Sequence, residues 1–136
     1  MSSKTYESFL GFRAKTARQL SMMFSGPWPY VYLVLAILFQ AGAWVFAAYI
    51  RSHLGGELLI LHNNPYFGID WIADGRAAFI LPYWSLGTLA LNFLSALLLA
   101  RHRFGRLFVH SLLGLSVFVA ALSLLDLLFI YFINFR

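Results

Sequence analysis

One acidic side chain lies inside the most apolar part of the chain, and it is the first candidate for chemistry. Asp126 occurs in the run AALSLLDLLFI, residues 120–130, and no basic residue lies within nine positions on either side. A charged acid facing lipid costs from about 2.5 kcal/mol upward, so we expect a neutral, hydrogen-bonded carboxyl group. Two hypotheses follow: Asp126 is a structural acid that holds two helices together, or it belongs to an ion or proton site.

Further titratable residues cluster earlier in the chain: His53, Glu57, His62, Asp70 and Asp74. Histidine and carboxylates suit zinc, but the four-residue spacing of His53 and Glu57 is compatible with a metal only if that stretch is helical. The chain has no cysteine, no glycine-rich phosphate loop and no nucleophile elbow. We therefore expect no catalytic residue, no cofactor and no bound metal, and an enzyme is the least supported function.

The composition shows which elements must position these residues. The chain is 61% hydrophobic and 11% charged, whereas soluble proteins are about 45–50% apolar and about 25% charged. Three apolar runs, residues 28–50, 77–100 and 107–135, each reach the ~20 residues that a helix needs to cross a bilayer. The sequence predicts an all-α integral membrane protein with three transmembrane helices in a domain of residues 27–136, and a compact outer loop over residues 51–76.

The basic residues are distributed unevenly over the 136-residue chain. Seven of the ten lysines and arginines lie before the first span or between the second and third spans. The positive-inside rule then predicts a cytoplasmic N-terminus and an external C-terminus. The net charge of +5 is explained by this topology, so we expect no nucleic-acid partner.

The N-terminal segment, residues 1–26, has the pattern of a basic amphipathic helix. Its apolar residues, such as Phe9 and Leu20, fall on one side, and Lys15 and Arg18 fall on the other. Such a helix lies in the membrane interface. We expect anionic lipid headgroups to contact the basic residues Lys15, Arg18, Arg101, Arg103 and Arg106, and His102 and His110 near the same turn.

Polar residues also form stripes on the predicted spans. The second span places Ser85, Thr88, Asn92 and Ser95 on one face, and the third places Ser116, Ser123, Asp126 and Asn134 within about 80° of one another. The short turn between these spans makes them antiparallel neighbours. We therefore predict an intramembrane polar site of Asp126, Ser85, Asn92 and Ser123, with Asp126 about 9 Å from the midplane and opposite Ser85.

The first span carries a stripe of small residues, Ala36, Ala43 and Ala47, with Gln40 among them. Small residues let helices approach closely, and a glutamine there can form a hydrogen bond across the contact. We interpret this stripe as a packing face.

The outer loop contains LHNNPYFGID, residues 61–70. This segment resembles a recurring pattern, Leu-His-x-Asn-x-Tyr-Phe-Gly-Ile-Asp, between the first two spans of small uncharacterised bacterial membrane proteins. His62, Asn64, Tyr66, Gly68 and Asp70 carry the resemblance. It implies the span architecture and a location in the bacterial plasma (inner) membrane, and no particular activity. Whether residues 57–62 form a strand or a short helix stays open, because periodicity does not decide this at such a length.

Three functions are consistent with these patterns. The first is a non-catalytic subunit of a membrane assembly, either self-associating or part of a larger complex, that uses the small face of the first span and the aromatic outer loop. The second is a homo-oligomeric ion or proton channel with Asp126 at its pore. The third is a metal-dependent membrane enzyme built on the outer loop.

Overall fold

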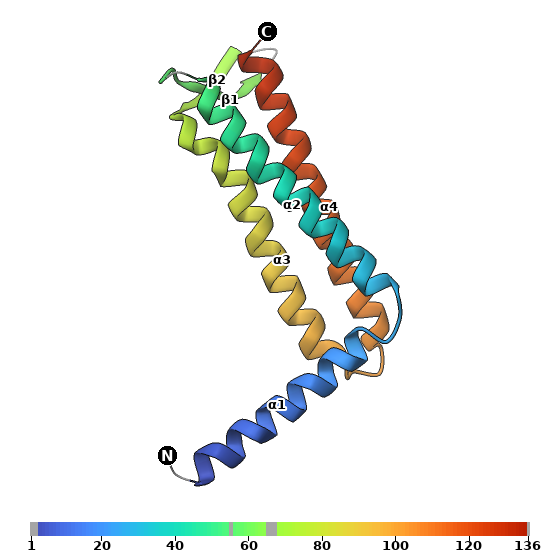
Figure 1. Cartoon of the computed structure of the whole chain (residues 1–136). Coiled ribbons are helices and arrows are strands. Elements are labelled where there is room, and N and C mark those ends of the chain that lie inside the picture. The colour runs from blue at the N-terminus through green and yellow to red at the C-terminus, as the bar shows by residue number, and fades with distance from the viewer. Residues whose placement is uncertain (1–2, 55, 65–67, 136) are drawn as a thin grey trace.

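The computed structural model describes residues 3–54, 56–64 and 68–135, with the side chains of 3–7 and 63–70 left outside the description. Four helices dominate it: α1 (Ser3–Met23), α2 (Trp28–His53), α3 (Ile80–Leu99) and α4 (Gly105–Asn134). A short 3-10 helix, Gly75–Phe79, leads into α3, and two strands, β1 (Leu59–Asn64) and β2 (Gly68–Ala73), lie between α2 and that helix. Figure 1 shows α2, α3 and α4 side by side, with α1 extending beyond them.

Within the described residues, three segments are long and apolar enough to cross a membrane: Trp28–His53, Gly75–Leu99 and Gly105–Asn134, with mean hydropathies of 2.1, 1.4 and 2.4. The three predicted spans are therefore confirmed, with each boundary displaced by three residues or fewer. The second span begins as a 3-10 helix, and Pro82 lies in the first turn of α3. Proline has no N–H to donate, and Pro82 lies close to the point where the span changes from 3-10 to α-helix, just after the Ile80 N–H donates to the Ala77 carbonyl oxygen.

The predicted packing face of the first span is confirmed. Ala36, Gln40, Ala43 and Ala47 are all buried, and Ala43 and Ala47 share an apolar cluster with Leu127 and Ile130 of α4. The small side chains on this face of α2 let the two helices approach closely. This face is covered within the chain, so the expectation that it is available to a partner chain is wrong.

Hydrogen bonds join the spans at two levels. At the midpoint of α2, Gln40 Nε2 donates to the Pro82 carbonyl oxygen (2.7 Å), and the Ser85 hydroxyl donates to Gln40 Oε1 (2.6 Å). In the half of the bundle nearer α1, Asn92 Nδ2 donates to the Ser116 hydroxyl (3.1 Å). These bonds satisfy polar groups where no water reaches them, and they fix the relative depth of the helices.

We predict measurable coupling between Gln40 and Ser85. Gln40→Leu and Ser85→Ala should each lower stability, and the double variant should lose less than the sum, by about 0.6–1.7 kcal/mol. Thermal unfolding of the four proteins in detergent completes this double-mutant cycle. Ser111→Ala is a matched control, because Ser111 is exposed on α4 and should leave stability unchanged. Strict additivity of Gln40→Leu and Ser85→Ala would contradict the hydrogen bond.

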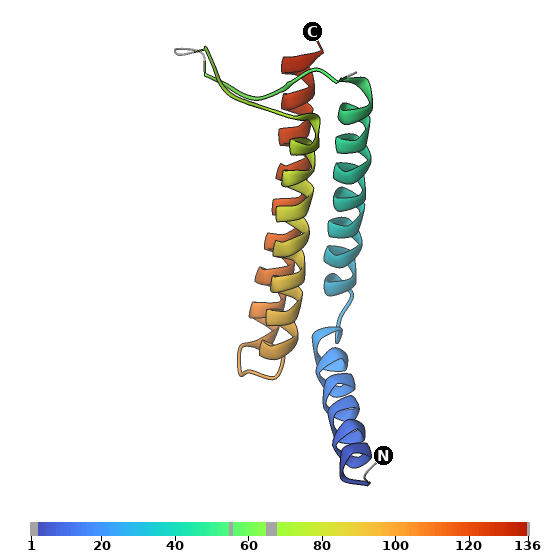
Figure 2. The ribbon, with the colours of Figure 1, turned by 90° about the vertical axis from the view of Figure 1, so that its left-hand side faces the viewer.

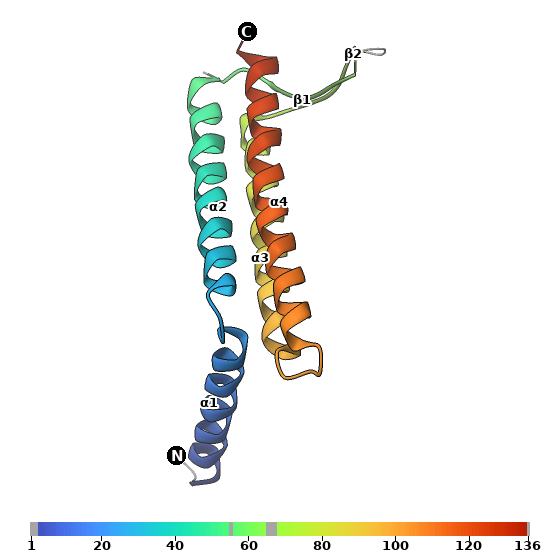
Figure 3. The same ribbon diagram turned by 90° about the vertical axis from the view of Figure 1, so that its right-hand side faces the viewer.

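The outer loop is a two-stranded antiparallel hairpin with Leu59 opposite Ala73 and Ile60 opposite Ile72. Residues 59–62 thus belong to a strand rather than a helix, because Leu59, Ile60 and His62 pair with residues of β2. Leu59 is fully buried in the cluster that contains Ile50 and Ile130. Figures 2 and 3 show the hairpin projecting sideways from the ends of α3 and α4, away from α2.

The two ends of the molecule differ. We call the end with the hairpin and the C-terminus the hairpin end. The opposite end, with the α1–α2 junction and the α3–α4 turn, is the elbow end (Figure 1). Helix α1 leaves the bundle obliquely there, and only its last part packs against the spans, where Met23 contacts the cluster of Ala96, Val109 and Leu113. The predicted N-terminal helix is confirmed, and its position in the membrane interface stays a prediction.

Candidate functional site

The predicted intramembrane site is not assembled as expected. Ser85, Asn92 and Ser123 are buried inside the bundle, but Asp126 is exposed, and Ser85 is hydrogen-bonded to Gln40 instead. The prediction that Asp126 pairs with Ser85 is therefore wrong. The buried residues of α4 form a stripe, and at 100° per residue Asp126 lies about 90° from the centre of that stripe. It therefore lies on the flank of the helix.

Asp126 lies in a groove at the hairpin end of the bundle. The groove has a volume of about 390 Å³. We define this hairpin groove by ten residues from three sources: Leu61, His62 and Trp71 of the hairpin, Ala77, Ile80 and Leu81 at the start of the second span, and Asp126, Phe129, Ile130 and Ile133 of α4. Its lining is apolar apart from Asp126 and His62.

The depth of Asp126 follows from its place in α4. The midpoint of Gly105–Asn134 falls between Val119 and Ala120, so Asp126 lies about 10 Å beyond it toward the hairpin end. If that midpoint marks the bilayer centre, Asp126 is still inside the hydrocarbon, whose half-thickness is about 15 Å. Its carboxyl group forms no hydrogen bond or ion pair with any residue that the structure describes.

Asn134 holds the hairpin on the end of α4. Its Oδ1 accepts from the Ile60 N–H (2.8 Å), and its Nδ2 donates to the carbonyl oxygens of Ile60 (2.8 Å) and Ile130 (2.7 Å). The amide thus pairs with the strand edge as a neighbouring strand would, and it satisfies partly buried backbone groups. The sequence placed Asn134 on the polar face of α4 but gave no sign of its contact with residue 60.

The residues of the outer-loop motif are only partly described. His62 is exposed and lines the hairpin groove. The backbones of Asn64 and Gly68 pair with each other, whereas Tyr66 and the side chains of Asn64 and Asp70 lie outside the described part of the chain. Their predicted contribution to a loop site stays a prediction.

The His53–Glu57 pair does not have the helical spacing that a metal site would need. Helix α2 ends at His53, and Gly56 takes a positive φ of 96° before Glu57. The ring nitrogen Nδ1 of His53 lies 2.9 Å from the Tyr49 carbonyl oxygen. Among the described residues, no group of three or more histidines or acids is arranged to hold a metal ion. The metal-enzyme alternative therefore has no support in this part of the chain.

The basic residues predicted to contact lipid headgroups all lie at the elbow end. Lys15 and Arg18 are on α1, Arg101 and Arg103 are in the α3–α4 turn, and Arg106 is in the first turn of α4; all five are exposed. The fold therefore brings two basic segments together that are far apart in the sequence.

The fold places the chain in the class of all-α, multi-pass membrane proteins, with three apolar helices preceded by an N-terminal helix and capped at one end by a β-hairpin. No model of a known protein family matches the chain, and comparisons with curated proteins and with solved structures likewise gave no match. The resemblance of residues 61–70 to other small membrane proteins stays a prediction.

Proposed function

We propose that this protein is a non-catalytic subunit of a membrane assembly and that the hairpin groove is its contact site. One observation carries the proposal: Asp126 is exposed at a depth where lipid would surround it. Gln40, Ser85, Asn92 and Ser116 all form hydrogen bonds inside the bundle. Since an acid facing lipid costs from about 2.5 kcal/mol upward, a partner that covers Asp126 stabilises the protein.

The charge of the groove indicates what kind of partner fits. A transmembrane helix with an arginine, lysine or amide side chain in the same half of the bilayer would pair with Asp126. In α2, α3 and α4, which the structure describes in full, the arginines and histidines lie near the helix ends. Arg51 lies about 16 Å beyond the midpoint of α2, compared with about 10 Å for Asp126 in α4. We therefore propose a helix of a different protein as the occupant, in preference to a second copy.

Substitutions of Asp126 distinguish an effect on the stability of the isolated chain from an effect on binding to a partner. Asp126→Leu should leave the stability of the isolated chain equal or higher, because no hydrogen bond within the described part of the chain is lost and an acid is removed from the lipid face. The same variant should lose its partner. Asp126→Asn should fold normally and keep weaker binding, since an amide donates and accepts hydrogen bonds without charge. Thermal unfolding in detergent and size-exclusion chromatography of complexes from native membranes measure the two effects.

A photo-crosslinking amino acid can identify the occupant directly. Phe129 lines the groove and is 57% exposed, and Val45 on the opposite helix α2 is 71% exposed and serves as the matched control. We expect a protein adduct from position 129 that is absent at position 45 and lost with Asp126→Leu. The crosslinked peptide should be a transmembrane segment with a basic or amide residue. An adduct at twice the 15.5 kDa mass would show self-association, and adducts with lipid alone would refute the assembly contact.

The exposed position of Asp126 also favours a second candidate, a homo-oligomeric channel in which this acid faces a shared axis. The other intramembrane hydrogen bonds close within one chain, so the channel is the weaker proposal. Ion flux through liposomes that contain the purified protein distinguishes the two. We expect none, and parental flux that Asp126→Asn abolishes would favour the channel.

We further propose that the elbow end faces the cytoplasm of a bacterial cell and that the hairpin end lies outside. The support is the positive-inside rule, because seven of the ten lysines and arginines occur in α1 and the α3–α4 turn region.

A further inference from the structure

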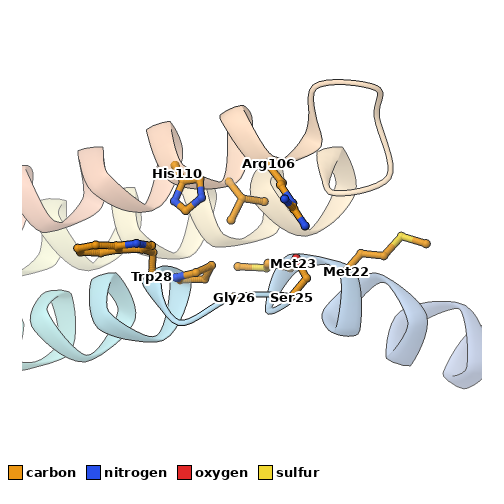
Figure 4. Close-up of a pocket in the computed structure, with 9 residues that line it drawn as sticks. Met22, Met23, Ser25, Gly26, Trp28, Arg106 and His110 are labelled. Atoms are coloured by element: carbon orange, nitrogen blue, oxygen red, sulfur yellow. The ribbon is translucent and has the colours of Figure 1, made fainter.

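A second cleft lies at the elbow end, where α1 joins α2 against the first turns of α4. It has a volume of about 200 Å³. We call it the elbow cleft and define it by nine residues: Met22, Met23, Ser25, Gly26, Trp28, Pro29, Arg106, Val109 and His110. Figure 4 shows the side chains of Arg106 and His110 directed from α4 toward the segment that joins the two helices, with Trp28 opposite His110.

The polar groups of this cleft can all donate hydrogen bonds. Arg106 is exposed, His110 is half-buried with its ring edge-on to Tyr32 at 5.8 Å, and Ser25 is exposed. The remaining side chains that line it are apolar or aromatic: Met22, Met23, Trp28, Pro29 and Val109, with Gly26 contributing backbone only. The cleft therefore combines a cationic wall with an apolar one, at the end of the apolar spans where Trp28 suits the headgroup level.

Among the described residues, Arg106 has no acidic partner. It forms no ion pair with any residue that the structure describes, and the chain has only five acids. Glu57, Asp70 and Asp74 belong to the region of the hairpin, and Asp126 lies in the far half of α4. Glu7 lies on α1 about 22 Å along the helix axis from Met22. The positive N-terminal ends of α2 and α4 lie here together with the negative C-terminal ends of α1 and α3, so the cationic character of the cleft comes from its side chains.

We propose that the elbow cleft is a binding site for the phosphate of an anionic phospholipid. The planar guanidinium of Arg106 suits two phosphate oxygens, and the His110 imidazole and the Ser25 hydroxyl are placed to donate to the same group. The apolar residues Met22, Val109 and Trp28 then face the glycerol and the upper acyl chains. Here the lipid occupies a discrete site between three elements, in addition to the diffuse attraction of the basic residues around it.

Native mass spectrometry of the purified full-length chain tests this site. The delipidated protein is titrated in detergent with phosphatidylglycerol, with phosphatidylcholine and with inorganic phosphate. We expect one phosphatidylglycerol to bind more tightly than phosphatidylcholine, and Arg106→Gln to weaken this binding about tenfold. His110→Gln should weaken it less. Arg101→Gln is the matched control, because Arg101 is exposed in the adjacent turn but does not line the cleft.

Each other outcome contradicts a defined part of the proposal. Equal losses with Arg101→Gln and Arg106→Gln would show diffuse attraction without a site. Displacement of the lipid by an equal concentration of inorganic phosphate would show a free-phosphate site instead. Thermal unfolding without lipid checks that the variants fold, and if Arg106→Gln does not fold, Ser25→Ala and His110→Gln test the same cleft. Unchanged lipid binding in both of these variants would then overturn the proposal.

Discussion

Gly105→Ala is expected to lower the free energy of unfolding by about 3 kcal/mol, at the upper end of the range for an inserted methyl group. Gly105 is buried at the start of α4, immediately after the turn from α3. A Cβ atom there would lie against the carbonyl oxygen of Ala100, 2.7 Å from the carbonyl carbon and 3.0 Å from the Leu99 carbonyl oxygen. All three are backbone atoms, so no side-chain rotation relieves the contact.

The turn itself has little freedom to adapt to this methyl group. The N–H of Gly105 donates to the His102 carbonyl (2.8 Å), and the N–H of His102 donates to the Leu99 carbonyl (2.9 Å). Opening the turn would break these bonds and separate the first turns of α4 from the end of α3. Thermal or denaturant-induced unfolding in detergent measures the loss.

Gly114→Ala is the matched control for this substitution. Gly114 lies further along the same helix, and an added Cβ there would meet nothing within 4 Å. Its stability should be unchanged or raised, since alanine favours a helix over glycine by up to about 1 kcal/mol. Equal effects of the two substitutions would show that the close approach at Gly105 is not a constraint.

Asn134→Leu is expected to release the hairpin from α4 while leaving the three spans assembled. The variant leaves the N–H and the carbonyl of Ile60 without their side-chain partner, and each unsatisfied group costs about 1–3 kcal/mol. Leu59 and the rest of the apolar cluster still hold the base of the hairpin. Hydrogen exchange should therefore accelerate strongly at the Ile60 amide and only slightly in the helices.

Asn92→Leu separates this local effect from a general loss of stability. Asn92 donates to Ser116 between α3 and α4, far from the hairpin, so its replacement should lower overall stability and leave exchange at Ile60 nearly unchanged. If both variants accelerate exchange at Ile60 to the same extent, Asn134 does not anchor the hairpin. Because the hairpin forms one wall of the hairpin groove, Asn134→Leu should also weaken the crosslink from Phe129.

The sequence alone determined the number of spans, their boundaries within a few residues and one packing face. Apolar runs of this length indicate transmembrane helices, because a helix satisfies its own backbone hydrogen bonds in a medium without water. The packing face of α2 was also predictable. Ala36, Ala43 and Ala47 recur at helical spacing, and a stripe of small residues on a transmembrane helix indicates close contact with another helix. The clustering of basic residues at one end was also predictable, because they lie before the first span or between the second and third spans.

The candidate sites depended on the tertiary structure. Helical periodicity placed Asp126 within about 80° of Ser116, but only the packing of α2 and α3 showed which flank of α4 stays open. Gln40 hydrogen-bonds to Ser85, 45 positions away, and Asn134 to Ile60, 74 positions away. These partners are determined by the relative depths of the helices and the angles at which they cross. Local sequence patterns do not determine either quantity. The elbow cleft likewise depends on the tertiary structure, because Arg106 and Ser25, distant in sequence, line the same cleft where α1 ends and α2 and α4 begin.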